Sequence, residues 1–319
     1  MNSRGHWRKS VLRNLEGYLF ASPWILGFLV LTAGSMLFSF SLSFAEWDAQ
    51  TPLREIDWVG LKNYSEMVKD DELFYKSLYN TAYYTLFSVP LRVTLALLLA
   101  LLLNQKVKGI AFFRTVFYLP SVVVGAATAV VWSWIFNPSY GLLNGLLHRM
   151  NLFLNWIHLE ALRIPEPEWL LSEAWSKPAL ILMSLWGLGG SMLIYLAGLQ
   201  GVPSHLYEAA DLDGASAFRK LWHVTIPMIS PTIFFNVIMS IIGSFQVFTQ
   251  VYIMSGGHAG GPNNSTLVYV LYLYRKAFVE LEMGYACALA WFLFLVILVL
   301  SVIIIRSSAL WVYYEGERR

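Results

Sequence analysis

The chain has 319 residues, of which 57% are hydrophobic and only 13% are charged. Its hydrophobic residues gather in runs long enough to cross a hydrocarbon core of about 30 Å, which takes about 20 helical residues, so the composition is that of an integral membrane protein. The net charge of +2 gives no indication of a nucleic-acid partner. The single cysteine, Cys287, excludes an intrachain disulfide and a cysteine-based metal site.

Six hydrophobic runs follow one another along the chain, and each predicts a membrane helix. They cover residues 18–44, 78–103, 112–136, 178–200, 228–254 and 284–305. The runs are continuous and rich in Leu, Val and Ile, which favours helices over the alternating strands of a membrane barrel. The predicted fold is all-α and membrane-integral. Its predicted parts are a cytoplasmic tail (1–17), a first helix (18–44), a core of five helices (78–305) and a second tail (306–319).

The first run could be a cleaved signal peptide, because Arg4, Arg8, Lys9 and Arg13 precede it. It is longer than the hydrophobic core of a signal peptide, which has about 7 to 15 residues, and no clear small-residue cleavage site follows. We therefore interpret it as a membrane helix.

Charge predicts the orientation of the helices. With the N-terminus inside, the inner segments carry 12 Lys and Arg, counting Arg114 at the start of the third run, against 6 Asp and Glu, whereas the outer segments carry 9 against 14. Because positive charge is retained on the cytoplasmic side, both termini are expected in the cytoplasm. Residues 201–227 then form an inner loop.

Arg92 completes the total of 22 basic residues and lies deep in the second run, close to Pro90. It could pair with an anion such as a carboxylate or a phosphate. Alternatively, its side chain could extend toward the membrane–water interface, or it could bind backbone carbonyls that the proline leaves without a partner. Both interpretations remain open from the sequence.

The loop 201–227 reads as two short helices that meet at a glycine. Ser204 is suited to cap a helix that extends to residue 213, and Gly214 supplies the bend that helix ends favour. A second short helix then leads to Pro227. Small residues at Ala209 and Ala210 would let the groove of a partner approach closely.

The fifth run carries polar residues on one side. At about 100° per residue, they fall within an arc of about 160° if the run is a single helix. They are Asn236, Ser240, Ser244, Gln246 and Gln250, with Gly243 among them. This face is predicted to line a solute pathway, and the alternative is hydrogen bonding between helices.

Residues of the inner loop resemble the EAA loop of bacterial ABC import permeases. Glu208-Ala209-Ala210, Gly214 and Pro227 fall in the register of that motif, with Val224 and Ile226 at its hydrophobic positions. Other stretches resemble the maltose-type carbohydrate permeases. They are Ser22-Pro23-Trp24, residues 58–64, Asn80-Thr81, and residues 114–120, 243–248 and 261–266.

This resemblance implies the type I importer permease (MetI-like) fold with six spans, in a bacterial cell (inner) membrane. The implied partners are a second permease, a dimer of cytoplasmic ATPases, an extracytoplasmic solute-binding protein, a carbohydrate substrate and membrane lipids. Glu208, Ala209, Ala210, Asp213 and Gly214 would couple to the ATPase, although Glu208 could instead act only as a helix-dipole partner. Arg92 keeps an acidic sugar or a sugar phosphate among the candidate substrates.

The chain itself is not expected to be an enzyme or to bind a cofactor or metal. It contains no Gly-x4-Gly-Lys-Ser/Thr, so ATP and Mg are expected at the separate ATPase. A secondary transporter driven by an ion gradient is the alternative, but it predicts paired acids in the membrane, and the six runs contain no Asp or Glu. A membrane enzyme is weaker still, because Cys287 has no histidine in its run.

Overall fold

The computed structural model describes residues 17–105, 107–159, 163–257 and 260–313. Arg4, Arg8, Lys9, Arg13 and the predicted tail before Gly17 lie outside the described residues, as do residues 314–319. The chain divides into two compact units. The first comprises residues 1–70 and 276–292, and the second comprises residues 71–275 and 293–319.

The first unit begins with a helical span, Gly17–Leu42, which includes a π-helical stretch. Its elements are η1 (Phe28–Gly34), α2 (Ser35–Leu42), β1 (Ala45–Glu46), η2 (Leu53–Glu55), β2 (Asp57–Trp58), α3 (Lys62–Lys69), most of η8 (Arg275–Val279) and the start of α16 (Met283–Trp311). The two strands are antiparallel, with Ala45 opposite Trp58.

One asparagine ties the end of the first span to α3. Asn63 Nδ2 donates to the carbonyl oxygens of Ser43 and Ala45, at 3.0 and 2.9 Å. At Gly284 in α16, an added Cβ would lie 1.9 Å from the Ala45 oxygen, so the close packing here requires glycine. The segment 58–64, noted above for its resemblance to sugar permeases, therefore builds the junction after the first span.

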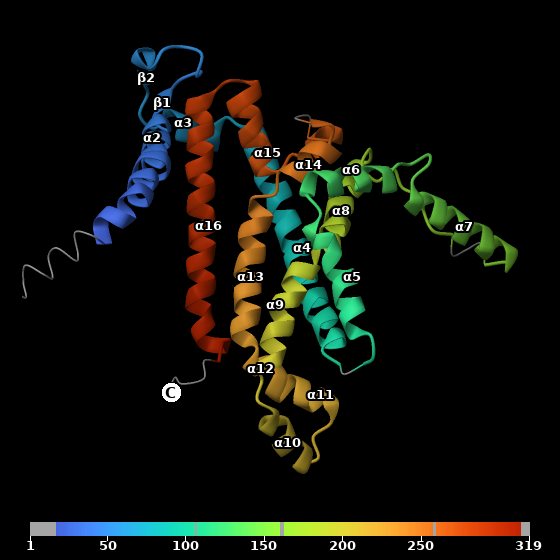
Figure 1. The fold of residues 1–319 in the computed structure, drawn as a ribbon. Coiled ribbons are helices and arrows are strands. Elements are labelled where there is room, and N and C mark those ends of the chain that lie inside the picture. The colour runs from blue at the N-terminus through green and yellow to red at the C-terminus, as the bar shows by residue number, and fades with distance from the viewer. Residues whose placement is uncertain (1–16, 106, 160–162, 258–259, 314–319) are drawn as a thin grey trace, which may run out of the picture. The chain divides into compact units, whose positions relative to one another are not determined.

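The second unit is a helical bundle (Figure 1). Its elements are α4 (Glu72–Leu103), α5 (Ile110–Val122), α6 (Gly125–Ile135), α7 (Leu142–Trp156), α8 (Glu173–Ser184), η4 (Leu185–Gly187), α9 (Gly189–Gln200), α10 (Ser204–Leu212), α11 (Ala217–Lys220), η5 (Leu221–Thr225), α12 (Ile226–Met228), α13 (Ser230–Phe245), α14 (Thr249–Met254), η7 (Pro262–Asn264), α15 (Tyr269–Tyr274) and the rest of α16. Within this unit, α10 and α11 lie at the opposite end from α6 and α14 (Figure 1).

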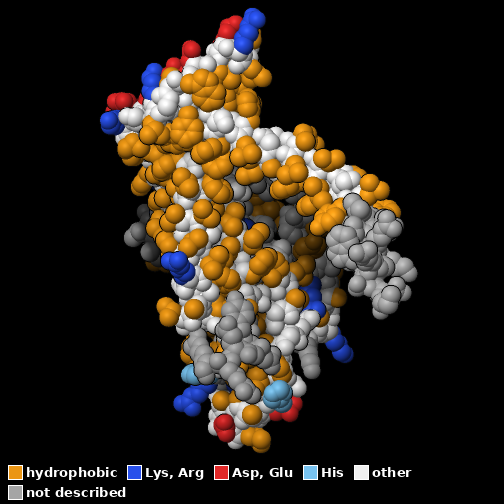
Figure 2. Space-filling model, turned by 90° about the vertical axis from the view of Figure 1, so that its left-hand side faces the viewer, with side chains coloured by type: hydrophobic (Ala, Val, Ile, Leu, Met, Phe, Trp, Pro, Cys, Tyr) orange, Lys and Arg blue, Asp and Glu red, His pale blue; other side chains and the backbone are white. Residues whose placement is uncertain are grey.

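All six hydrophobic runs are helical, as predicted, but only three of them are unbroken helices. Gly17–Leu42, Glu72–Leu103 and Met283–Trp311 are each long and apolar enough to cross a membrane, and the third and fourth runs are bent pairs. The fifth run comprises α13 and α14, and a third bent pair joins residues 217–228 to α13. The bends measure 98° between α5 and α6, 47° before α9 and 68° before α13. On the face shown in Figure 2, hydrophobic side chains cover most of the helical surface, as expected for contact with lipid.

The bends correct the expectation of one continuous helix per run, and they have local causes. Val123 and Val124 have extended backbone conformations between α5 and α6. Before α13, Pro231 lacks an N–H and its ring would clash with the carbonyl of residue 227, so the helix is interrupted at Ile229. A proline thus marks the break before α13, whereas Pro90, Pro120 and Pro178 each lie inside a helix.

The hydrophobic core of the second unit joins α4 to α9. Small side chains on α4 let α9 approach closely, and large side chains of α9 fill the remaining space. The buried members are Ala96, Ala100, Leu103, Met192, Tyr195, Leu196, Leu199 and Ile229.

Candidate functional site

The predicted pair of short helices is present between α9 and α13. α10 ends at Leu212, and Gly214 follows with a φ of +70°, a conformation that glycine adopts without strain. The N–H of Ala215 bonds to the Ala210 oxygen at 2.9 Å and that of Gly214 to the Asp211 oxygen at 3.1 Å, which is the Schellman pattern of helix termination. The predicted turn at Gly214 is therefore confirmed.

The predicted cap at Ser204 is wrong. Pro203 occupies the N-cap position in an extended conformation, and Ser204 is the first helical residue, with no side-chain capping bond. The fixed φ of proline sets the entry into the helix, so no serine cap is needed there. The second helix does have a side-chain cap, because Ser216 Oγ accepts from the N–H of Arg219 at 3.4 Å.

Two side-chain contacts brace the two helices against each other. The hydroxyls of Tyr207 and Thr225 lie 2.9 Å apart, and Lys220 Nζ lies 2.7 Å from Asp211 Oδ1. The first contact is half-buried, while the second is largely exposed and contributes less. The bracing contacts are internal to residues 204–228, so the segment can keep its shape without a partner.

Most of the predicted coupling residues lie on the surface. Glu208, Ala209, Asp213 and Gly214 are exposed, and Ala210 is half-buried. Within the part of the chain that the structure describes, the Glu208 carboxylate makes no hydrogen bond or ion pair. It is thus available to a partner.

Sequence reasoning missed the apolar part of this surface. Leu212 is 90% exposed and Phe218 is 69% exposed, while Trp222 is 53% exposed and stacks edge-on against Phe218. The sequence did contain a signal for this apolar surface, namely three large hydrophobic residues within a short polar segment. We name Glu208, Leu212, Asp213, Gly214 and Phe218 the α10–α11 surface; α10 and α11 lie at the lower end of the view in Figure 1.

The predicted polar face of the fifth run is not a single helical face. α13 ends at Phe245, so Gln246 and Gln250 leave the helix on which the arc was drawn. Gln246 is exposed, and the amide of Gln250 packs against Gly125 of α6, 3.0 Å from where a Cβ would stand. The assumption of one helix from residue 228 to 254 is wrong, whereas the pathway role of these residues stays a prediction.

The other three residues of this face are buried inside the bundle. Asn236 Nδ2 donates to the Thr232 oxygen at 3.0 Å, and Ser244 Oγ donates to Thr85 Oγ1 of α4 at 2.9 Å. Ser240 is also buried. For Ser244, the structure thus shows the interhelical hydrogen bond that was the alternative interpretation.

Arg92 is half-buried on α4, which continues as a helix through Pro90. Its Nε is buried and has no hydrogen-bond partner among the described residues. The expected bonds to carbonyls freed by the proline are therefore not made by this nitrogen. Arg114, at the start of the third run, does have a hydrogen-bond partner. Its Nε and Nη2 both donate to the Leu103 oxygen.

At the opposite end of the bundle from α10, the segment 260–269 is fastened to α4 and α8. Asn80 Nδ2 donates to the oxygens of Asn264 and Leu267 at 2.9 and 3.0 Å, and Thr81 Oγ1 accepts from the Tyr269 N–H at 2.8 Å. Two stretches that were noted separately in the sequence, Asn80-Thr81 and residues 261–266, thus meet here. His258, in the glycine-rich turn before them, lies outside the described residues.

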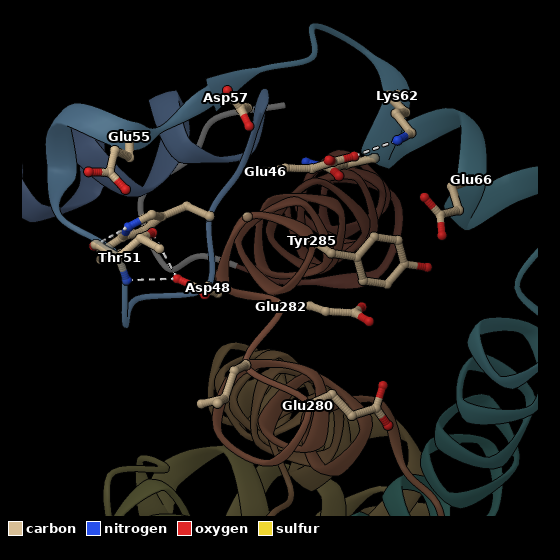
Figure 3. Close-up of a pocket in the computed structure, with 14 residues that line it drawn as sticks. Glu46, Asp48, Thr51, Glu55, Asp57, Lys62, Glu66, Glu280, Glu282 and Tyr285 are labelled. Carbon is tan, nitrogen blue, oxygen red and sulfur yellow. Dashed lines mark hydrogen bonds and ion pairs between the residues drawn. The ribbon is translucent and has the colours of Figure 1, made fainter.

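The first unit contains an acidic pocket of about 500 Å³ (Figure 3). Its acidic lining residues are Glu46, Asp48, Glu55, Asp57, Glu66, Glu280 and Glu282. Lys62 Nζ lies 2.6 Å from Glu46, and this contact raises the pKa of Lys62. Hydrogen bonds from Thr51 lower the pKa of Asp48. Among the described residues, no group of three or more His, Cys, Asp or Glu is arranged to hold a metal ion.

Comparisons with known proteins cover nearly the whole chain. The family described as "Binding-protein-dependent transport system inner membrane component" matches residues 75–312. The probable ABC transporter permease protein YesP of Bacillus subtilis (strain 168) is 42% identical over 95% of this chain and 94% of its own. The arabinooligosaccharides transport system permease protein AraP of the same organism is 32% identical over 94% and 90%.

A solved structure shares the fold. It is that of a bacterial alginate ABC transporter in complex with an alginate pentasaccharide-bound periplasmic protein, with a TM-score of 0.76, 22% identity, and coverage of 94% of this chain and 96% of that one. At this identity the likeness concerns the fold alone. Together with the helical architecture, the family match shows that the chain belongs to the inner membrane components of binding-protein-dependent transport systems, the permeases of ABC importers.

Proposed function

We propose that this chain is a permease subunit of an ATP-driven importer for a carbohydrate and forms half of the translocation pathway. The observation that carries the proposal is the exposed α10–α11 surface, a preformed element inside the region that matches the family. The name of the arabinooligosaccharide permease supports a sugar or oligosaccharide as the solute.

The α10–α11 surface couples the chain to an ATPase subunit. Leu212 and Phe218 offer exposed apolar anchors of the kind that dominate interfaces, and Glu208 offers a charge for a charge-assisted contact. Ala209 leaves room for close approach. Because Tyr207 and Asp211 brace the two helices, closure of the ATPase dimer moves the segment as a rigid body, and the spans follow.

The remaining partners follow from this role. A second permease completes the pathway, two ATPase subunits bind ATP and Mg, and an extracytoplasmic solute-binding protein delivers the sugar. The chain lies in the bacterial cell membrane with both termini in the cytoplasm, as the distribution of Lys and Arg supports. ATP hydrolysis belongs to the separate ATPase, so this chain contributes no catalytic residue.

An ion-gradient-driven transporter is the competing function. Such a transporter needs titratable groups in the membrane, and none of the six hydrophobic runs contains Asp or Glu. The exposed Glu208, Leu212 and Phe218 would also have no role in it.

Co-purification in mild detergent tests the proposal. The wild-type chain is expected to bring down an ATPase and a second permease, whereas Glu208→Lys and Phe218→Ala are expected to lose the ATPase and keep the permease. Glu168→Lys is the control, because it makes the same charge change at another exposed glutamate far along the chain. Recovery of the wild type alone, together with uptake driven by an ion gradient without ATP, would refute the proposal.

A further inference from the structure

A polar stripe runs along one side of α4 and stops in the middle of the helix. At about 100° per residue its members fall within an arc of about 100°. They are Thr81, Tyr84, Thr85, Ser88 and Arg92. Farther along the helix the adjoining side is apolar, where Ala96 and Ala100 pack against α9. The stripe therefore leads from one end of the span to Arg92 and is closed there by the hydrophobic core.

The polar groups at the beginning of the stripe are satisfied, and those at its deep end are not. Thr81 Oγ1 accepts from the Tyr269 N–H, and Thr85 Oγ1 accepts from Ser244 at 2.9 Å. Ser88 is completely buried, yet its Oγ has no hydrogen-bond partner among the described residues, and the same holds for Arg92 Nε. Buried groups without partners are costly, so two of them one helical turn apart indicate a missing ligand.

The surroundings of Arg92 supply hydroxyls but no negative charge. Tyr84 is 5% exposed and lies on the same side of α4 as Ser88 and Arg92. None of the six hydrophobic runs contains an Asp or Glu that could neutralise the arginine. A guanidinium inside a span is expensive unless an anion pairs with it.

We propose that Arg92 binds an anionic group of the transported carbohydrate, a uronate carboxylate or a phosphate, while Ser88 and Tyr84 bind its hydroxyls. A guanidinium can donate two parallel hydrogen bonds to either anion. The inference rests on the proposed function, since it names the substrate class for the same pathway. Ser88 Oγ and Arg92 Nε are the two groups of the stripe that have no partner among the described residues, so they are the groups that an anionic sugar would satisfy.

The first experiment measures which sugars the cognate solute-binding protein recognises. Its melting temperature is recorded with three sets of probes: uronate-containing oligosaccharides, the same oligosaccharides with their carboxyl groups reduced, and sugar phosphates. Stabilisation by uronates or by phosphates supports the inference and identifies the source of the anion. Stabilisation by the neutral probes alone overturns it but leaves the carbohydrate importer intact, and stabilisation by no probe counts against both.

The second experiment measures uptake of the recognised anionic probe by the complete importer in proteoliposomes. Arg92→Gln is expected to lower uptake about tenfold or more, and Arg92→Lys, which keeps the charge, is expected to lower it less. Arg54→Gln is the control, because the side chain of Arg54 is 83% exposed in the other unit. Basal ATP hydrolysis and subunit recovery, measured for every variant, separate this effect from failure to assemble. Equal uptake by wild type and Arg92→Gln, with intact assembly, would overturn the inference.

Discussion

Two loops of the second unit use their polar residues in opposite ways. In the segment 260–269, polar side chains and backbone are buried against Asn80, Thr81 and α8. In the α10–α11 segment, the polar residues are exposed and the bracing bonds stay inside the segment. The first arrangement fixes a loop to its bundle, whereas the second preserves the shape of an element that a partner can move. The destination of the hydrogen bonds thus distinguishes a loop that is fixed to its bundle from a loop whose bonds stay within itself.

The largest effect is expected at Asn80. Asn80→Leu removes two hydrogen bonds to the oxygens of Asn264 and Leu267 and leaves both carbonyls in a buried site. A loss of about 2 to 4 kcal/mol in stability is expected, seen as a lower melting temperature in detergent. Asn155→Leu, at an exposed asparagine, is the control. Equal melting temperatures for wild type and Asn80→Leu would show that the loop is not held by this contact.

A matched glycine pair sharpens the comparison. Gly214 and Gly261 both have a φ of +70°, but an added Cβ finds open space at Gly214 and lies 2.5 Å from Thr266 Oγ1 at Gly261. Gly261 also has a ψ of −168°, a combination that is essentially restricted to glycine, so its backbone strain adds to the clash. Alanine is expected to cost about 1 kcal/mol at Gly214, from backbone strain alone, and about 2 kcal/mol or more at Gly261. Thermal melts of the two variants give the difference. Similar melting temperatures would mean that Thr266 moves aside freely.

A smaller effect is expected from the brace between α10 and η5. Tyr207→Phe removes the hydroxyl that lies 2.9 Å from Thr225 and is expected to reduce stability by about 1 kcal/mol. If rigidity serves coupling, the ratio of solute imported to ATP hydrolysed should fall in reconstituted importer while ATPase binding persists. An unchanged ratio would assign the contact to folding alone.

The smallest effect concerns pH at α7. A hydrogen bond from Asn151, together with the ion pair to His148, holds the pKa of Glu166 below its usual value of 4.5. Because the pKa of Glu166 is depressed in the folded chain, the contact stabilises α7 at pH values above the ordinary pKa. This stabilisation is lost as the pH falls through the lowered pKa. The protection factor of the Ile164 amide, which donates to Asn151, should therefore fall in acid when exchange is corrected for the intrinsic rate at each pH. Glu166→Gln should abolish this dependence, and a pH response that survives it must arise elsewhere.

Hydrophobicity alone was enough to predict the six helical runs, and the glycine and alanine pattern was enough to predict the α10–α11 turn. The bends were not predicted, because hydrophobicity sums over a window while Val124 and Pro231 act on single backbone dihedrals. The predicted polar face that includes Gln246 was wrong for the same reason. The prediction assumed one helix through residue 254, whereas α13 ends at Phe245. The contact between Asn80 and Asn264 could not be read from the sequence, because nothing local connects residues so far apart.

The separation of 184 residues between Asn80 and Asn264 also bears on biogenesis. During synthesis, α4 is made long before the segment 260–269. Until that segment exists, Asn80 and Thr81 lack the hydrogen bonds that they make with it in the folded chain. Completion of this end of the bundle is therefore one of the last steps of assembly, and a ribosome that stops before residue 260 leaves a chain with exposed polar groups in its second span. Asn80 and Thr81 therefore gain these partners only after the segment 260–269 has been made.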